Sequence, residues 1–223
     1  MLRKRLTAFA TAIALCLTGA ALVPASSMAL DPILFVRGWN GSASNWSTMK
    51  ARFEKDGYPP SHLLAYNYNT STSNKTTGET EVKARVDQLL ASTGATKVDI
   101  LAHSMGSLNS RWYLKFVPGA QEKVDDWVSF GGPNHGTSLA NVCFSTTCVE
   151  MRIGSKFLTE LNAGEETPGA VNYGTWWSTC DAFINPEESV ILSGATNTNV
   201  GCVSHLGLVS NEAIYKQVRE FIK

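Results

Sequence analysis

The hydrophobic positions of this chain form two kinds of pattern, one typical of buried strands and one typical of amphipathic helices. Apolar or mostly apolar runs predict strands over residues 33–36, 63–67, 97–102, 124–130, 171–177 and 189–193. Apolar residues at helical spacing predict helices over 46–57, 82–94, 105–117 and 157–161, and a closing helix through 214–222. The polar stretch 69–78 is expected to be a loop. Strands that alternate with helices imply an α/β fold with a mostly parallel sheet covered on both faces.

The first 29 residues follow a different pattern. A basic run at Arg3, Lys4 and Arg5 precedes an apolar stretch over 6–23, which ends in small residues before position 30. This order predicts a secretory signal peptide over 1–29 that is cleaved, leaving one catalytic domain over 30–223. A membrane anchor is the alternative, and the small-residue exit favours cleavage over a stable anchor. Secretion to the extracellular space follows from this interpretation.

Charge and cysteine content narrow the class of protein. The 223 residues hold 19 Lys and Arg against 19 Asp and Glu, so a nucleic-acid partner is not expected. Cleavage would remove three basic residues and Cys16, leaving a formal charge of −3 and four cysteines. An even number in an exported protein favours two disulfides. Three pairings of the four cysteines are possible. In the favoured one, Cys180–Cys202 would join the loop that contains Asp181 to the loop that contains His205, and Cys143–Cys148 would close a small surface loop.

Ser104 is the strongest candidate for chemistry. It lies in Ala102-His103-Ser104-Met105-Gly106, between a predicted buried strand and a predicted helix. Small residues two positions before and after the serine permit the sharp turn of a nucleophile elbow, which exposes the hydroxyl above the sheet. The alternative is an ordinary helix-capping serine. The strand before it and the helix after it favour the nucleophile.

A serine nucleophile needs a base, and His205 fits best. In hydrolases with this elbow the chain order is serine, acid, histidine. His205 follows the last predicted strand and precedes the closing helix, where a catalytic histidine loop belongs. His135 follows an earlier strand and is the runner-up. His62 and His103 are expected to be structural or to line the pocket.

Asp181 is the expected acid because it comes four residues after the strand predicted to end at Trp177. Glu187 and Glu188 are the alternative acids, but they are expected to lie in a solvated turn. Asp125 and Asp126 come too early in the chain to be the acid, within or before a predicted strand. The acid would hold the imidazole in the correct tautomer and stabilise the imidazolium. Backbone N–H groups of Met105, directly after the serine, and of Trp39, in the loop after the first strand, would form the oxyanion hole.

These motifs resemble those of the small secreted bacterial lipases of the α/β-hydrolase fold, the group of the minimal Bacillus lipase. The matching pieces are the strand at 32–36 with its Gly38 loop, the Ala-His-Ser-Met-Gly elbow, Phe130-Gly131-Gly132 and His205-Leu206-Gly207-Leu208. The resemblance implies a compact α/β hydrolase that cleaves acylglycerols or related carboxylic esters through an acyl-enzyme on Ser104, Asp181 and His205. The resemblance implies that such a hydrolase needs no cofactor and no metal. We expect a monomer acting on a lipid or ester substrate, also at a lipid–water interface.

Two departures from that group stand out. The first loop begins Arg37-Gly38 in place of the usual His-Gly, and the segment 133–180 is longer and carries cysteines. This segment could form a partial lid or a stabilised rim. Other acyl chemistry remains open, namely polyester or phospholipid hydrolysis or acyl transfer. A binding protein without turnover is also open, although no triad member is missing.

Overall fold

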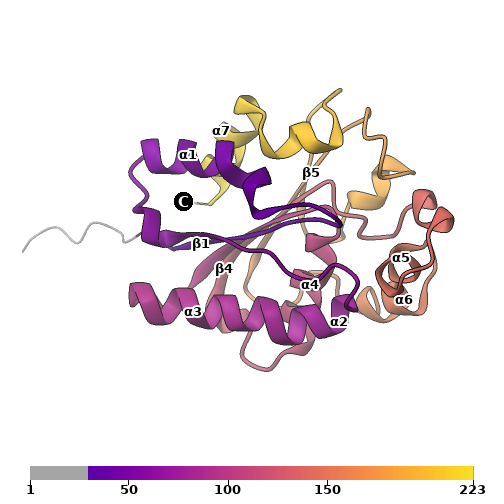
Figure 1. Ribbon diagram of the computed structural model, residues 1–223, viewed down its shortest axis with the longest axis horizontal. Helices are drawn as coiled ribbons and strands as arrows, with labels where there is room; N and C mark the ends of the chain where they lie inside the picture. Colours follow the sequence, from indigo (N-terminus) through magenta and orange to yellow (C-terminus); the bar gives the residue numbers. More distant parts are fainter. Residues whose placement is uncertain (1–29, 223) are drawn as a thin grey trace, which may run out of the picture.

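The computed structural model describes residues 30–222, so the predicted signal peptide at 1–29 lies outside the described residues. Six strands form one sheet in which every neighbouring pair is parallel, in the order β2-β1-β3-β4-β5-β6 (Figure 1). The strands are β1 (Ile33–Val36), β2 (Leu63–Ala65), β3 (Val98–His103), β4 (Val124–Phe130), β5 (Asn172–Trp177) and β6 (Thr196–Asn199). The predicted α/β-hydrolase architecture is confirmed.

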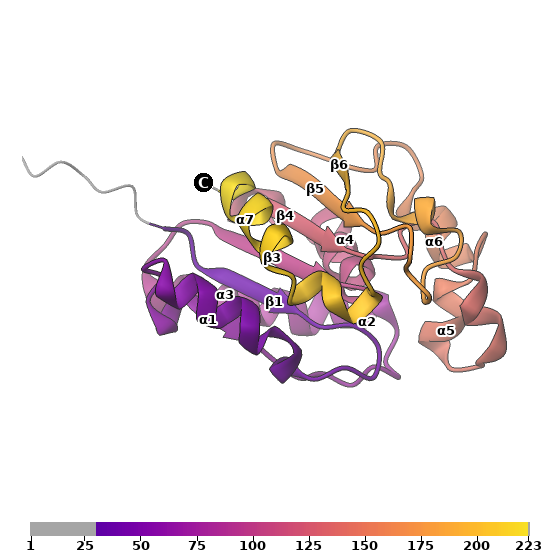
Figure 2. The same ribbon diagram turned by 90° about the horizontal axis from the view of Figure 1, so that it is seen from above.

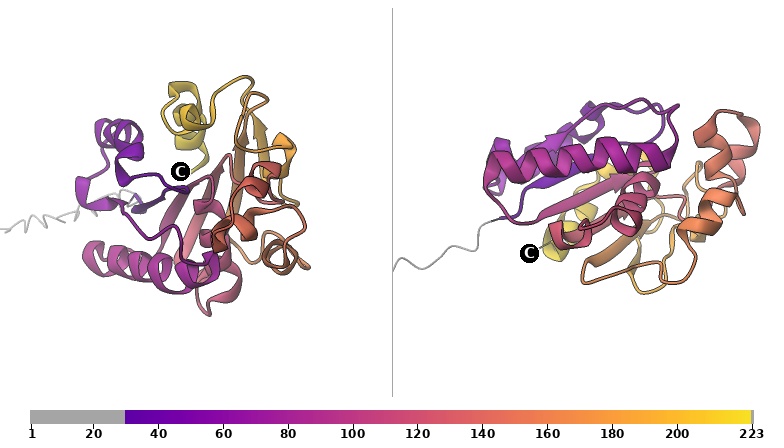
Figure 3. Two further views of the ribbon diagram at one scale, coloured as in Figure 1. Left: turned by 45° about the vertical axis from the view of Figure 1, so that its right-hand side comes forward. Right: turned by 90° about the horizontal axis from the view of Figure 1, so that it is seen from below.

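Helices cover both faces of this sheet. They are α1 (Ser47–Lys55), α2 (Asn74–Thr77), α3 (Lys83–Thr93), α4 (Gly106–Phe116), α5 (Thr146–Met151), α6 (Lys156–Leu161) and α7 (Glu212–Phe221). Helices α1 and α7 pack on one face, and α2, α3 and α4 on the other, as Figures 1 and 3 show. Alternate residues of the central strands face opposite cores. Ile33 and Phe35 belong to the core under α1 and α7, and Leu34 and Val36 to the other core.

The last strand lies later in the chain than predicted. The segment expected to be a strand at 189–193 contains no strand: it begins with the last two residues of a helical turn over Glu187–Val190, and β6 is the polar sequence Thr-Asn-Thr-Asn at 196–199. Val190 and Leu192 are buried without pairing as a strand. β6 has a strand neighbour on one side only, where it pairs with β5, and its residues are mostly exposed. An edge strand therefore carries no apolar pattern that a sequence search would detect.

The segment 69–78 is also not a simple loop. Helix α2 begins at Asn74 and continues through a single wide turn, Gly78–Val82, into α3. Ser73 caps its start, and the buried Glu150 accepts hydrogen bonds from Asn74. A Cβ on Gly78 would lie 2.5 Å from the Asn109 carbonyl oxygen of α4. Polar residues are thus buried here by contacts that are distant in sequence.

Two buried aspartates, Asp99 and Asp126, lie near the amino ends of β3 and β4, whereas Ser104 lies at the carboxyl ends of the strands. The Asp126 N–H donates to Asp99 Oδ1 at 3.2 Å, and Asn172 donates to Asp126 Oδ1 at 2.7 Å. Burial, with Asp125 and Asp31 adding negative charge, raises the pKa of Asp126 to about 6. Burial and the Asp126 charge raise the pKa of Asp99 as well. Protonation of this pair therefore stabilises the folded state.

Candidate active site

Ser104 lies in the turn between β3 and α4, with a backbone φ of 54° that non-glycine residues rarely adopt. Its N–H donates to the Phe130 carbonyl of β4 at 2.9 Å. The turn is closely packed: a Cβ on Gly106 would lie 2.5 Å from the Val36 carbonyl oxygen, and one on Gly38 would lie 2.7 Å from Ser104 Cβ. Small residues at these positions thus let the serine approach the loop after β1, as a nucleophile elbow requires.

His205 and Asp181 form a buried pair beside this turn. His205 Nδ1 lies 2.7 Å from Asp181 Oδ2, and the two residues are 5% and 4% exposed. The other carboxylate oxygen of Asp181 accepts backbone N–H bonds from Phe183 at 2.9 Å and Ile184 at 3.1 Å. Both oxygens of the acid are therefore held in place, which leaves the Nε2 side of the imidazole for chemistry.

His103, which the sequence analysis expected to be structural or pocket-lining, has both roles. Its Nε2 lies 3.1 Å from the His205 carbonyl oxygen, and the two rings pack with their centroids 4.5 Å apart. Burial, with a smaller effect of His205, lowers the pKa of His103 to about 3. The ring is thus neutral near pH 7 and donates from Nε2 to that carbonyl. Phe183 also stacks on the His205 ring, with the two ring centroids 5.0 Å apart.

The backbone N–H groups of Trp39 and Met105 have no hydrogen-bond partner within residues 30–222. Met105 is fully buried, and a buried backbone N–H without a hydrogen-bond partner costs free energy of folding unless a ligand accepts from it. Both residues adjoin Gly38 and Ser104, which are in contact range of each other. Two free donors beside a serine can stabilise a negatively charged oxygen formed on a substrate.

A pocket of about 610 Å³ opens above Ser104 and His205. Its lining is mainly apolar and comes from the loop after β1, from the segment before α5 and the end of α5, from the loop after β5 and from the helical turn after β6. It includes Trp39, Leu139, Ala140, Val142, Met151, Phe183, Ile184 and Leu206. The Ser104 hydroxyl has no hydrogen-bond partner among the described residues, and Ser104 and His205 line the same pocket. The shape and lining suit an apolar substrate.

The runner-up residues lie elsewhere. His135 pairs with Glu166 at 2.7 Å and is absent from the pocket lining. Glu187 and Glu188 lie in the helical turn before β6. Asp125 pairs with Lys97, and Asp126 belongs to the cluster near the amino ends of the strands. Asp181, in contrast, pairs with His205, which lines the same pocket as Ser104.

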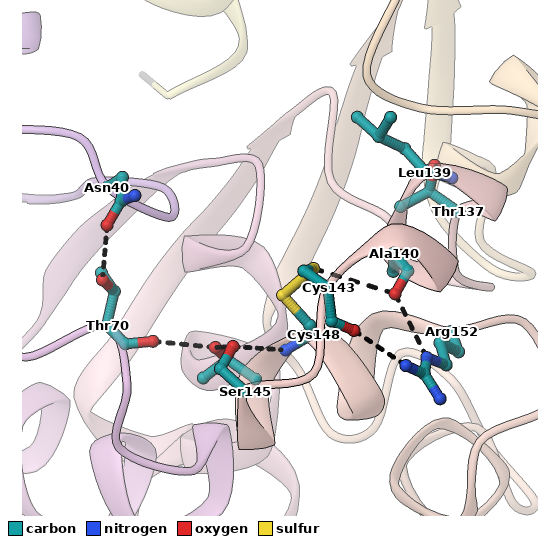
Figure 4. The surroundings of a disulfide bond; sticks show 10 residues. Asn40, Thr70, Thr137, Leu139, Ala140, Cys143, Ser145, Cys148 and Arg152 are labelled. Atoms are coloured by element: carbon teal, nitrogen blue, oxygen red, sulfur yellow. Dashed lines mark hydrogen bonds between the residues drawn. A yellow bond between two sulfur atoms is a disulfide. The ribbon is translucent and has the colours of Figure 1, made fainter.

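The structure contains the disulfides Cys143–Cys148 and Cys180–Cys202, the pairing that the sequence analysis favoured. Cys180–Cys202 joins the loop of Asp181 to the loop of His205. Cys143–Cys148 stands at the rim of the pocket, where Arg152 donates to the carbonyls of Ala140 and Cys143 at 3.1 and 2.8 Å (Figure 4). Figure 2 shows α5 and α6 beyond the end of the sheet. The longer segment 133–180 thus supplies one wall of the pocket.

Within residues 30–222, no helix is both long and apolar enough to cross a membrane. The same residues contain no group of three or more His, Cys, Asp or Glu side chains arranged to hold a metal ion.

Several known proteins resemble this chain. Lipase B of Pseudozyma antarctica is 30% identical over 169 residues, which cover 71% of this chain and 48% of that protein. A triacylglycerol lipase of Burkholderia plantarii is 38% identical over 61 residues, covering 27% of this chain and 16% of that enzyme. The chain thus spans at most about half the length of these relatives.

Solved structures share the fold. The mature form of the Bacillus licheniformis lipase BlEst2 matches with a TM-score of 0.77 at 18% identity, over 90% of this chain and 95% of that one. Aspergillus fumigatus lipase B matches with a TM-score of 0.72 at 20% identity, over 83% of this chain and 50% of that one. The model of the family "Lipase (class 2)" matches residues 30–201. The chain therefore belongs to the class 2 lipase family.

Proposed function

We propose that this protein is a serine ester hydrolase with Ser104 as nucleophile, His205 as general base and Asp181 as the acid that orients His205. The observation that carries the proposal is the 2.7 Å contact between His205 Nδ1 and Asp181 Oδ2, because His205 lines the same pocket as Ser104, whose backbone φ is 54°. Membership of the class 2 lipase family supports this assignment.

The reaction has two half-reactions. His205 Nε2 takes the Ser104 proton while Oγ attacks the ester carbonyl, and the oxyanion is stabilised by the N–H groups of Trp39 and Met105. The tetrahedral intermediate collapses as His205 protonates the departing alcohol, which leaves an acyl-serine. Water then attacks the acyl group, gives a proton to His205, and releases the carboxylic acid as Ser104 recovers its proton.

The pocket lining supports carboxylic esters with apolar acyl groups, acylglycerols among them, as substrates. Leu139, Val142 and Leu206 are 42%, 76% and 59% exposed, so the mouth of the pocket presents apolar side chains to solvent. The triacylglycerol lipases among the relatives fit this substrate class. Two disulfides and the pattern of residues 1–29 support a secreted protein, and we propose that it acts as a monomer after removal of a signal peptide.

The test is hydrolysis of p-nitrophenyl esters from acetate to palmitate by the wild type and three variants. We expect Ser104→Ala and His205→Ala to lose about three orders of magnitude or more in kcat. His135→Ala is the matched control and should keep kcat/KM, since the His135–Glu166 pair lies outside the pocket lining. An inactive wild type would reject the function, and an active Ser104→Ala would reject the nucleophile.

A further inference from the structure

Arg37 is a buried cation at the start of the loop 37–41, which we name the oxyanion loop. It is 6% exposed, and none of the ion pairs among residues 30–222 includes it. Burying a guanidinium without a carboxylate is costly unless its donors are well satisfied. The partners of Arg37 are therefore informative.

The side chain of Arg37 binds backbone carbonyls. Nη1 donates to the Gly38 carbonyl at 3.0 Å, and Nη2 donates to the Tyr68 carbonyl. The guanidinium also lies over the Tyr68 ring, 4.5 Å from its centre. In return the Tyr68 hydroxyl donates to the backbone carbonyl of Arg37 at 2.7 Å and accepts from Asn109 at 3.0 Å. Two successive carbonyls of the oxyanion loop, those of Arg37 and Gly38, are thus held by one interlocked pair of side chains.

The hold on the Gly38 carbonyl has a consequence for the next residue. A trans peptide is planar, with its C=O and N–H on opposite sides. The Gly38 carbonyl is bound by Arg37 and by the Gly41 N–H at 3.3 Å, so the Trp39 N–H of the same peptide is directed away from those partners. That N–H has no hydrogen-bond partner in the described residues, and Gly38 itself is packed against Ser104.

We propose that Arg37 is a positioning residue of the oxyanion hole. It holds the Gly38–Trp39 peptide so that the Trp39 N–H is presented to the oxyanion before substrate binds, and it places a positive charge next to that peptide. The inference rests on the proposed function, because it assigns a role within the same site. A guanidinium stays charged at every working pH and can bind carbonyls of two separate segments at once, which a neutral imidazole with one N–H cannot do.

Arg37→Gln and Arg37→Lys test this role through kcat, KM and the inhibition constant of an alkylboronic acid, whose tetrahedral serine adduct uses the oxyanion hole. We expect Arg37→Gln to lower kcat by about 10- to 100-fold, less than the loss of a donor itself, with little change in KM. The boronate inhibition constant should rise in proportion. Arg37→Lys keeps the charge with a less suitable donor geometry and should recover part of the loss.

Arg111→Gln is the matched control. Arg111 is also buried and also binds Asn162 Oδ1 and the Glu166 carbonyl, at 3.0 and 3.1 Å, but it does not line the pocket. The Arg111→Gln substitution should lower the melting temperature, while kcat and the boronate inhibition constant stay within about two-fold of the wild type. A merely structural Arg37 would behave in the same way.

Tyr68→Phe keeps the proposal falsifiable if Arg37→Gln does not fold, because it removes one hydroxyl and retains the ring under the guanidinium. We expect a loss of about three- to ten-fold in kcat. The proposal is overturned if folded Arg37→Lys and Tyr68→Phe both keep wild-type kcat and boronate inhibition. This outcome differs from failure of the proposed function, which an inactive wild type or an active Ser104→Ala would show.

Discussion

Replacing Gly131 by alanine should slow catalysis without removing any atom of the proposed triad. Gly131 follows β4 with a φ of 56°, and a Cβ there would lie 2.9 Å from Asp181 Oδ2 and 3.0 Å from His205 Nδ1. These are the two atoms joined by the 2.7 Å contact. Ordinary contacts begin near 3.4 Å, so the carboxylate and the ring must each retreat by about 0.4 to 0.5 Å.

The size of the effect follows from that displacement. A misplacement of about 1 Å can cost a hundred-fold in rate, so half of it should cost about ten-fold in kcat/KM. The left-handed backbone adds about 1 to 2 kcal/mol of strain for alanine. For a domain of this size that loss corresponds to a drop of about 2 to 8 °C in melting temperature.

Gly94→Ala separates the two effects. Gly94 ends α3 with a φ of 73°, and no atom lies within 4 Å of a Cβ placed there. The melting temperature of Gly94→Ala should fall by a similar amount, while its kcat/KM stays at the wild-type value. Both variants are assayed with p-nitrophenyl butyrate. If Gly131→Ala keeps kcat/KM within about two-fold of the wild type, Gly131 does not pack tightly against the pair and the reasoning is refuted.

Three further predictions concern stability and the base. Folding raises the pKa of Asp126 from 3.8 to about 6, so its contribution is full below the unfolded value and is lost as pH rises through about 6. Asp126→Asn should remove this loss, on the order of 3 kcal/mol, in urea unfolding at acidic and alkaline pH; an unchanged pH profile would contradict the raised pKa of the Asp99–Asp126 pair. Replacing Cys180 and Cys202 by alanine opens a loop of sequence separation 22 and should cost about 3 kcal/mol by calorimetry, against about 2 for the five-residue Cys143–Cys148 loop. His103→Phe should lower kcat about ten-fold, since the carbonyl of the base loses its donor, yet the pH at which the rate halves should not move because His103 is already neutral; a displaced pH profile would show that His103 itself titrates in the reaction.

The buried aspartates with raised pKa values and the residues of the proposed chemistry lie at opposite ends of the strands. The titrating aspartates lie near the amino ends of β3 and β4, whereas Ser104, Asp181 and His205 lie in loops beyond the carboxyl ends. In a parallel sheet, all the loops that follow the carboxyl ends of the strands lie at the same end of the sheet, where segments distant in sequence can form one site. The pH dependence of stability and that of the rate should therefore be separable by mutation.

The sequence by itself determined the α/β architecture and the place of the most specific motif. Strands β1, β3 and β4 are buried on both faces, so their sequences are mostly apolar, although β3 and β4 also carry Asp99, Asp125 and Asp126 near their amino ends. The turn at Ser104 depends on neighbours within two residues, and the proposed acid and base follow it in the chain order that this chemistry uses. Local patterns of this kind need no knowledge of distant contacts.

Only the tertiary structure decided the features that depend on contacts between distant segments. β6 is polar because it is an exposed edge strand, and residues 74–82 are helical because Glu150 and α4 bury their polar groups. His103 contacts the carbonyl of a residue 102 positions later, and the Arg37 carbonyl accepts from Tyr68, 31 positions away. Hydrogen bonds across such separations have no periodicity in the sequence, since each is set by where the folded strands and helices bring two segments together.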